Sequence, residues 1–246
     1  MIDPLSLSRL SAAMLRTAFW SVLLVLSFHA TGLKAQIPVS LELVLAVDTS
    51  ESVDGFEFGL IKRGMAAAFR NEKVIRLIEV QNGVAIALYQ WSSGIDRKYM
   101  VPWTVLRSGA DCLTFAASLE DLERDPHRGF TAIGRALAFG VQILNENRYQ
   151  GRRAKIDLSG DGQNNSGRSP DAAREAARLF GIEINGLPIL TSTYEDSREL
   201  DAYFLEEVIV GPGAFVEIAD DYSDFERAFL RKLIREITPL LAERPN

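Results

Sequence analysis

The sequence predicts an α/β fold in which a mainly parallel β-sheet is covered by helices on both faces. Apolar runs of strand length alternate along the chain with segments of helical spacing, an order that is typical of parallel sheets. The composition is that of a globular protein, with 47% hydrophobic and 24% charged residues. Residues 36–246 therefore suit a single domain of the α/β class.

The first predicted elements rest on clear local patterns. The apolar runs VSLELVLAV (39–47) and GVAIALYQWS (83–92) predict buried strands. RKYMVPW (97–103) follows a Ser-Gly turn, so we expect it to pair antiparallel at a sheet edge, where Pro102 is tolerated. Helical spacing predicts helices over 56–69, 110–122 and 131–147.

The second half of the chain continues the alternation. RRAKIDLSG (152–160) predicts a buried strand that enters a Gly/Asn loop. PDAAREAARLFG (170–181) predicts a helix, because proline stands at its start and glycine at its end. The remaining predicted elements are two strands, 182–190 and 213–219, and two helices, 197–209 and 222–237.

Residues 1–35 have the pattern of a secretory signal. Arg9 and Arg16 precede the apolar run 17–28, and Ala35 is a small residue at a plausible cleavage point. The run is shorter than the roughly 20 residues that span a bilayer comfortably, although an uncleaved N-terminal anchor is an alternative. We expect a periplasmic or secreted protein, with no stable membrane span after cleavage.

Charge and residue counts exclude several classes of function. The formal net charge of −6 and the lack of a basic cluster disfavour a nucleic-acid partner. Cys112 is the only cysteine, so the chain cannot form an internal disulfide. Outside residues 1–35, His127 is the only histidine, so a His- or Cys-rich zinc site cannot be built.

Five oxygen-bearing side chains stand at predicted strand ends and at a helix start. Asp48, Ser50 and Ser52 follow the first strand, Thr131 opens a helix, and Asp161 follows the strand 152–160. In open α/β sheets, ligands bind beyond the carboxyl ends of the strands. Two carboxylates and three hydroxyls without nitrogen or sulfur suit a hard cation, with Mg²⁺ or Mn²⁺ ahead of Ca²⁺.

This ordered set resembles the metal-ion-dependent adhesion site of von Willebrand factor A (VWA) domains. The matching motifs are DTSES (48–52), GFT (129–131) and SGDG (159–162), and LSGDGQNNSG resembles a little-characterised bacterial secreted branch of that superfamily. The resemblance implies a six-stranded sheet with one antiparallel edge strand. It implies a divalent ion held directly by Ser50, Ser52 and sometimes Thr131. Asp48 and Asp161 would act directly or through water.

The resemblance also implies a function. A coordination position left open on the ion is often filled by a carboxylate of a partner, so we expect a non-enzymatic, adhesion-type module that binds a protein or another acidic ligand. Glu51 stands where the family commonly has a small residue, and it could screen an incoming acidic group. Asp157, inside an apolar run, is expected to be a structural buried carboxylate or a group that supports the ion site.

Two other functions remain open on the sequence. Some phosphatases use an aspartyl nucleophile that follows a buried strand, so Asp48 could be the nucleophile of a metal-dependent phosphoesterase. That chemistry normally needs a second acidic residue two positions later, and Ser50 stands there instead. A scaffold whose site is degenerate and empty is the third possibility. Separately, Thr131 has an alternative role as a helix N-cap without a ligand role, and it could do both.

Overall fold

The computed structural model describes residues 36–127, 129–191 and 199–239. From Ile37 onward they belong to one compact unit. The predicted signal, residues 1–35, lies outside the described residues. No helix among the described residues is both long and apolar enough to cross a membrane.

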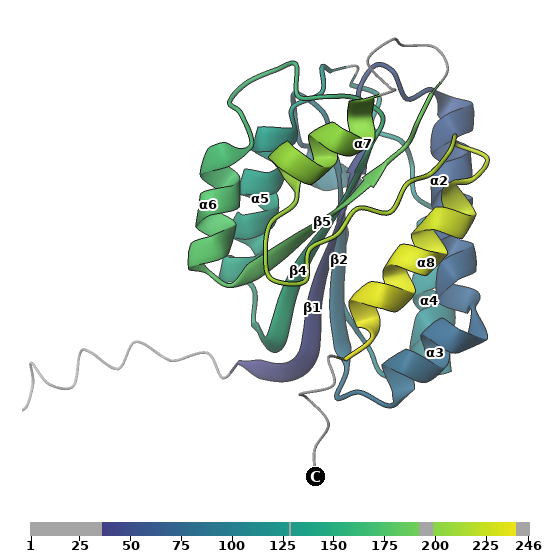
Figure 1. The fold of residues 1–246 in the computed structure, drawn as a ribbon. Helices are drawn as coiled ribbons and strands as arrows, with labels where there is room; N and C mark the ends of the chain where they lie inside the picture. Colours follow the sequence, from purple (N-terminus) through teal and green to yellow (C-terminus); the bar gives the residue numbers. More distant parts are fainter. Residues whose placement is uncertain (1–35, 128, 192–198, 240–246) are drawn as a thin grey trace, which may run out of the picture. The chain divides into compact units, whose positions relative to one another are not determined.

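The centre of the fold is a five-stranded sheet in the order β3-β2-β1-β4-β5 (Figure 1). β2, β1, β4 and β5 are parallel, and β3 pairs antiparallel with β2 at one edge. The strands are β1 (Ile37–Asp48), β2 (Val84–Trp91), β3 (Val101–Leu106), β4 (Tyr149–Gly160) and β5 (Ile182–Pro188). The predicted fold class is confirmed.

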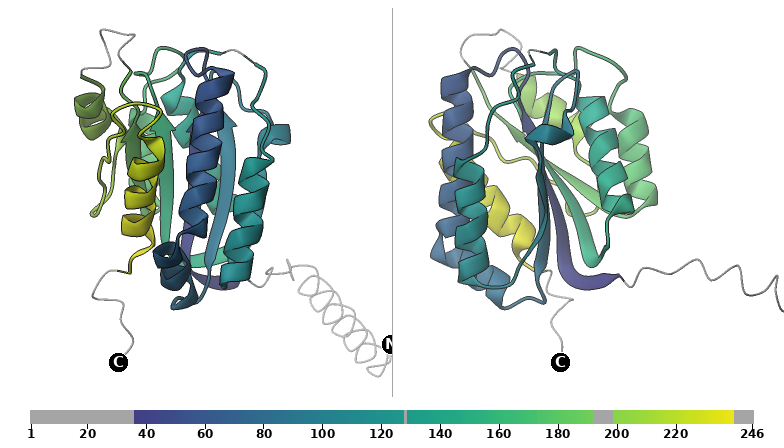
Figure 2. Two further views of the ribbon diagram at one scale, coloured as in Figure 1. Left: turned by 90° about the vertical axis from the view of Figure 1, so that its right-hand side faces the viewer. Right: turned by 180° about the vertical axis from the view of Figure 1, so that it is seen from behind.

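Helices cover both faces of the sheet, as Figures 1 and 2 show. One face carries α2 (Gly55–Arg70), α3 (Glu72–Glu79), α4 (Gly109–Glu120) and α8 (Phe225–Ile237). The other face carries α5 (Ile133–Glu146), α6 (Asp171–Leu179) and α7 (Leu200–Tyr203), which continues as η4 (Phe204–Val208). A short 3₁₀ turn, η2 (Arg97–Tyr99), precedes β3.

The central strand β1 shows why a continuous apolar run is needed here. Leu43 and Leu45 belong to the core beneath α2 and α8, whereas Val44 and Ala46 belong to the core beneath α5. Successive side chains of a strand point to opposite faces, and both faces are covered, so neither set can be polar. Each of these four side chains is at most 1% exposed.

The number of strands differs from the prediction. The resemblance implied six strands, but the described residues form five, because residues 213–219 do not form a continuous ladder. Val216 and Ala219 make only isolated parallel bridges to Gly186 and Ile189 beside β5. This segment therefore lies along the sheet edge without extending it.

The bounds of other elements also differ from the prediction. The segment 97–103 was predicted to be the edge strand, but η2 occupies its first part and β3 runs from Val101 to Leu106. The helix α3 was not predicted. The predicted helix 197–209 is α7 and η4 from Leu200 onward, and its first two residues lie outside the described residues.

Candidate metal centre

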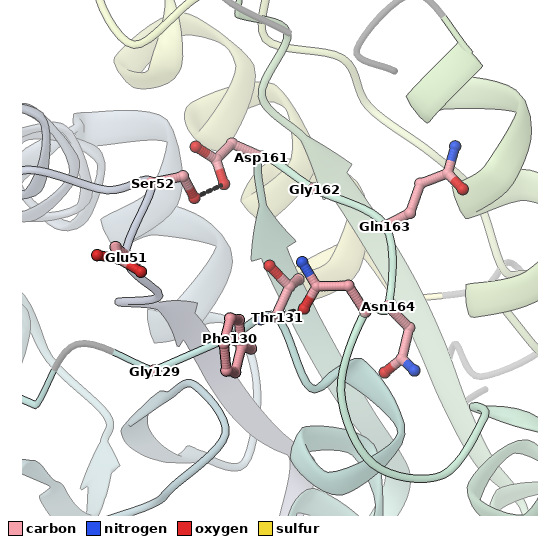
Figure 3. Close-up of a pocket in the computed structure, with 10 residues that line it drawn as sticks. Glu51, Ser52, Gly129, Phe130, Thr131, Asp161, Gly162, Gln163 and Asn164 are labelled. Atoms are coloured by element: carbon pink, nitrogen blue, oxygen red, sulfur yellow. Dashed lines mark hydrogen bonds between the residues drawn. The ribbon is translucent and has the colours of Figure 1, made fainter. Parts of the chain in front are cut away.

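The strand order brings the predicted loops together. β1 and β4 are adjacent and parallel, with Val47 opposite Ser159. Their carboxyl ends therefore meet at one edge, which places the loop after Asp48 beside Asp161 (Figure 3). Glu51 N donates to the carbonyl of Gly129 at 2.8 Å, which fastens the segment before α5 to the same edge.

A chain of hydrogen bonds joins four of the five predicted residues or their backbones. Ser52 Oγ donates to Asp161 Oδ1 at 2.7 Å and lies 3.1 Å from Ser50 Oγ. The backbone N–H of Ser50 donates to Asp48 Oδ1 at 2.7 Å. A hydroxyl that binds a cation must turn its hydrogen away from the ion, and Asp161 accepts that hydrogen from Ser52 while the lone pairs of Ser52 stay available.

Thr131 reaches this cluster from the segment before α5. A Cβ built on Gly162 would lie 3.4 Å from Thr131 Oγ1, so the Thr131 hydroxyl faces the backbone beside Asp161. The N-cap of α5 is Ala132, not Thr131, and that cap has no side-chain hydrogen bond. The alternative in which Thr131 serves only as a helix N-cap is therefore wrong.

Two asparagines clip the Asp161 loop to the start of α5. Asn165 Oδ1 accepts from Thr131 N at 2.9 Å, and Asn165 N donates back to the Thr131 carbonyl at 2.9 Å. Asn164 Oδ1 accepts from Gly134 N at 3.1 Å, so it satisfies an orphan N–H of the first helical turn. These side chains set the distance between Thr131 and Asp161.

The loop after β1 is fixed at its far end by the start of α2. Asp54 Oδ1 accepts from Phe56 N at 2.7 Å and from Glu57 N at 2.8 Å. Glu57 Oε2 accepts from Asp54 N at 2.7 Å, which completes a capping box. Residues 48–53 are consequently held between a strand end and a capped helix.

Asp48 carries the clearest sign of a missing positive partner. It is 1% exposed, and its Oδ2 has no hydrogen-bond partner among the described residues. Burial, and after it the charge of Asp161, raises the pKa of Asp48 to about 8. A Cβ on Gly160 would lie 2.8 Å from Asp48 Oδ2, so only glycine leaves this oxygen its space.

The donor set fits a divalent cation. Two carboxylates without a basic side chain between them would be compensated by a dication, and the hydroxyls would supply neutral oxygen ligands. No group of three or more His, Cys, Asp or Glu side chains able to hold a metal occurs in the described part of the chain. A cation at this edge would therefore depend on serine and threonine.

Tyr222, in the segment before α8, is a site residue that the sequence analysis missed. Its hydroxyl donates to Asp161 Oδ2 at 2.8 Å, and the side chain is only 6% exposed. Burial and the nearby carboxylates raise the pKa of Tyr222, so the phenol stays protonated and keeps donating. One oxygen of Asp161 is thus held by Ser52 and the other by Tyr222.

A pocket of about 420 Å³ opens above this cluster. Figure 3 shows Ser52 and Asp161 on one side of it and Phe130 and Thr131 on the other. Glu51 is exposed at its rim, and Phe130 is 62% exposed. The lining residues are Glu51, Ser52, Gly129, Phe130, Thr131, Asp161, Gly162, Gln163, Asn164 and Asn165.

Asp157 has a structural role away from the pocket. Lys232 Nζ lies 2.6 Å from Asp157 Oδ1 and 2.7 Å from Glu236 Oε1, and all three side chains are at most 2% exposed. Asn185 also donates to Glu236 at 2.9 Å. Burial, then the Glu236 carboxylate, raises the pKa of Asp157 to about 7 despite Lys232. This buried cluster joins α8 to β4 and β5.

Comparison with known families gives one match along most of the chain. A model of the family described as "Protein of unknown function (DUF1194)" matches residues 38–241. No curated protein matches the sequence.

Solved structures share the fold at low sequence identity. The pilus adhesin SpaC from Lactobacillus rhamnosus GG is 17% identical with a TM-score of 0.59, covering 80% of this chain and 30% of that chain. Proximal thread matrix protein 1 from the mussel byssus, in a form with a zinc-occupied MIDAS motif, is 15% identical with a TM-score of 0.56, covering 81% and 48%.

A third structure extends the comparison. The PilB minor pilin from Streptococcus sanguinis is 11% identical with a TM-score of 0.60, covering 85% of this chain and 64% of that chain. This chain therefore spans less than two thirds of each of the three proteins. Together these likenesses confirm the predicted VWA-like fold.

Proposed function

The chain belongs to the DUF1194 family of proteins of unknown function, and we propose that it is a metal-dependent binding module of the adhesion type. Asp48, Ser50, Ser52, Thr131 and Asp161 would hold a divalent cation, Mg²⁺ or Mn²⁺ ahead of Ca²⁺. The cation would supply an open coordination position. A protein or another carboxylate-bearing ligand would bind there.

One observation carries the proposal: Asp48 Oδ2 is buried without a hydrogen-bond partner among the described residues, and hydrogen bonds through Ser50 join Asp48 to Ser52 and Asp161, which line a pocket. A buried carboxylate without a partner is costly, and a cation would remove that cost. The pocket gives a ligand access to Ser52, Thr131 and Asp161. Adhesin and pilin proteins share the fold, which supports protein binding and an extracellular or periplasmic location.

Chain organisation is part of the same proposal. Residues 1–35 would direct secretion, and residues 36–246 would form the single VWA-like domain. Glu51 at the pocket rim would influence which acidic ligands are admitted.

The phosphoesterase alternative has no support from the geometry. An aspartyl nucleophile must reach its substrate, but Asp48 is 1% exposed and does not line the pocket. Its Oδ1 is also occupied by the backbone N–H of Ser50. We therefore assign Asp48 to the cation rather than to covalent chemistry.

Calorimetric titration of Mg²⁺ into the chelator-treated protein tests the cation step. The wild type should give saturable heat, and Ser52→Ala and Thr131→Ala should weaken it. Ser118→Ala and Thr114→Ala are matched controls, because in the described part of the chain those hydroxyls bond to carbonyls of their own helix α4. Equal Mg²⁺ affinity in all five proteins would show that Ser52 and Thr131 do not bind the cation. Absence of heat in the wild type would support a scaffold with an empty site.

Pull-down from the native envelope tests the ligand step. The immobilised protein should retain a partner in Mg²⁺ and release it in chelator, and Ser52→Ala should retain less. Retention that is unaffected by chelator would contradict binding through the cation.

A further inference from the structure

Arg124 lies behind the loop that carries three of the predicted cation ligands. Its Nη2 donates to the carbonyl oxygens of Thr49 at 3.2 Å, Ser50 at 3.2 Å and Val53 at 2.8 Å. Its Nη1 donates to the Asp125 carbonyl at 3.0 Å. One guanidinium group thus donates to three carbonyls of the loop 49–53, whose backbone N–H groups have other partners.

Those N–H groups point the other way. Thr49 N donates to the Trp91 carbonyl at 2.9 Å, and Glu51 N donates to the Gly129 carbonyl at 2.8 Å. Without Arg124 the loop carbonyls would lose their charged donor in a part-buried environment. Hydrogen bonds to charged groups are stronger than neutral ones, so this contact is a strong restraint on the shape of the loop.

A single peptide group connects Arg124 to the Asp48 carboxylate. The guanidinium bonds to the oxygen of the Thr49–Ser50 peptide, and the N–H of the same peptide donates to Asp48 Oδ1 at 2.7 Å. Hydrogen bonds in such a chain polarise one another. Arg124 is therefore linked to a predicted cation ligand through one peptide group, without occupying the cation's place.

The backbone on both sides of Arg124 is itself anchored. Gln90, 1% exposed at the end of β2, accepts from Asp125 N at 2.7 Å and donates to the Glu123 carbonyl at 2.6 Å. Lys62 of α2 donates to the Leu122 carbonyl at 3.2 Å. The backbone around Arg124 is therefore held by the sheet and by α2, in addition to the bonds that Arg124 makes to the loop.

From these contacts we propose that Arg124 is a positioning residue of the cation site. It holds residues 49–53 in the shape that presents Asp48, Ser50 and Ser52 to the ion before the ion arrives. This inference rests on the proposed function, because it concerns the affinity of the same site. Arg124 would thus influence the affinity for the cation although it is not one of the five proposed ligands.

Titration of Mg²⁺ into the full chain after chelator treatment tests the role of Arg124. Arg124→Met should bind Mg²⁺ about tenfold more weakly, a factor in keeping with loss of charge-assisted hydrogen bonds. Arg124→Lys should lie between Arg124→Met and the wild type, because an ammonium group can reach the loop carbonyls but does not reproduce the guanidinium fork. Thermal melts in chelator and in Mg²⁺ accompany each titration.

Arg70→Met is the matched control. Arg70 joins the ends of α2 and α4 through two bonds to Glu120, at 2.6 and 2.8 Å, and does not contact the loop. It should change the melting temperature in chelator without changing Mg²⁺ affinity. This contrast separates a positioning role from a general loss of stability.

The outcomes are distinct. Weaker binding in Arg124→Met and Arg124→Lys but not in Arg70→Met supports the inference. Wild-type affinity in a folded Arg124→Met overturns it and leaves the proposed function standing. Should Arg124→Met fail to fold by circular dichroism, Arg124→Lys decides: roughly threefold weaker binding supports the inference, and unchanged affinity overturns it. Absence of Mg²⁺ binding by the wild type overturns both proposals.

Discussion

Replacing Asp48 by asparagine should have opposite effects on stability and on cation binding. The substitution keeps the size of the side chain and its oxygen for the Ser50 N–H, but it removes the charge from a carboxylate that is 1% exposed. Without an ion the folded state must either bury this charge or neutralise it with a proton, and both cost free energy, because Asp48 Oδ2 has no partner among the described residues. With an ion it is needed.

The size of the burden follows from the pKa of Asp48, which folding raises from 3.8 to about 8. At pH 7 about three pKa units of this difference act against the native state, at 1.36 kcal/mol each, which gives about 4 kcal/mol. The new amide N–H₂ would lack a partner and cost about 1–3 kcal/mol. The net stabilisation in chelator should be about 2 kcal/mol, a rise in Tm of roughly 4–8 °C.

Urea unfolding at pH 7 measures this effect in chelator and in Mg²⁺. Asp48→Asn should exceed the wild type in chelator, and Mg²⁺ should stabilise the wild type more than the variant, since a ligand stabilises the state that binds it. Asp121→Asn, at an exposed residue that follows α4, controls for the loss of a surface charge. Equal destabilisation of Asp48→Asn in both conditions would refute the reasoning.

Three further predictions concern the same edge of the sheet. Tyr222→Phe removes the donor to Asp161 Oδ2 and should lower the free energy of unfolding by about 1.5–3 kcal/mol, measured with urea; no change would show that this bond is not formed in solution. Gly160→Ala places a methyl group 2.8 Å from Asp48 Oδ2 and 3.2 Å from the Trp91 ring. It should lower the free energy of unfolding by about 1–3 kcal/mol and weaken Mg²⁺ binding in calorimetry. Gly94→Ala, where a Cβ would meet no atom within 4 Å, should leave Mg²⁺ binding unchanged. Finally, the pKa values of Asp48 and Asp157 are raised to about 8 and about 7, so above pH 4 the native state holds more protons than the unfolded chain. The midpoint of urea unfolding in chelator should therefore fall as the pH rises from 5 to 8. A midpoint that rises with pH would contradict both pKa shifts.

Sequence patterns were sufficient for the elements that carry their own signal. The apolar run of β1 predicts a strand buried on both faces, and the end of β4 from Ile156 is buried in the same way. The order of three short motifs placed Asp48, Thr131 and Asp161 at one edge, where the structure has them. Local spacing and topology decide these features, and both are visible in a single sequence.

Features that depend on distant partners were not predictable. Tyr222 bonds to a residue 61 positions away, and Arg124 bonds to carbonyls more than 70 positions away; no local pattern marks either residue. Residues 213–219 have a strand-like composition, but only isolated bridges form beside β5. The short helix α3 was missed because it has only eight residues and follows directly after α2.

The bonds from Ser52 to Asp161 and from Asp161 to Tyr222 span the domain from its first strand to its last helix. Cation affinity should consequently act as a measure of chain integrity. A chain cut between these segments, or one that still lacks the segment before α8 during synthesis, would lack the Tyr222 hydroxyl that holds Asp161, even though β1 and β4 had already paired. Capture of partners would then be restricted to molecules whose folding is finished.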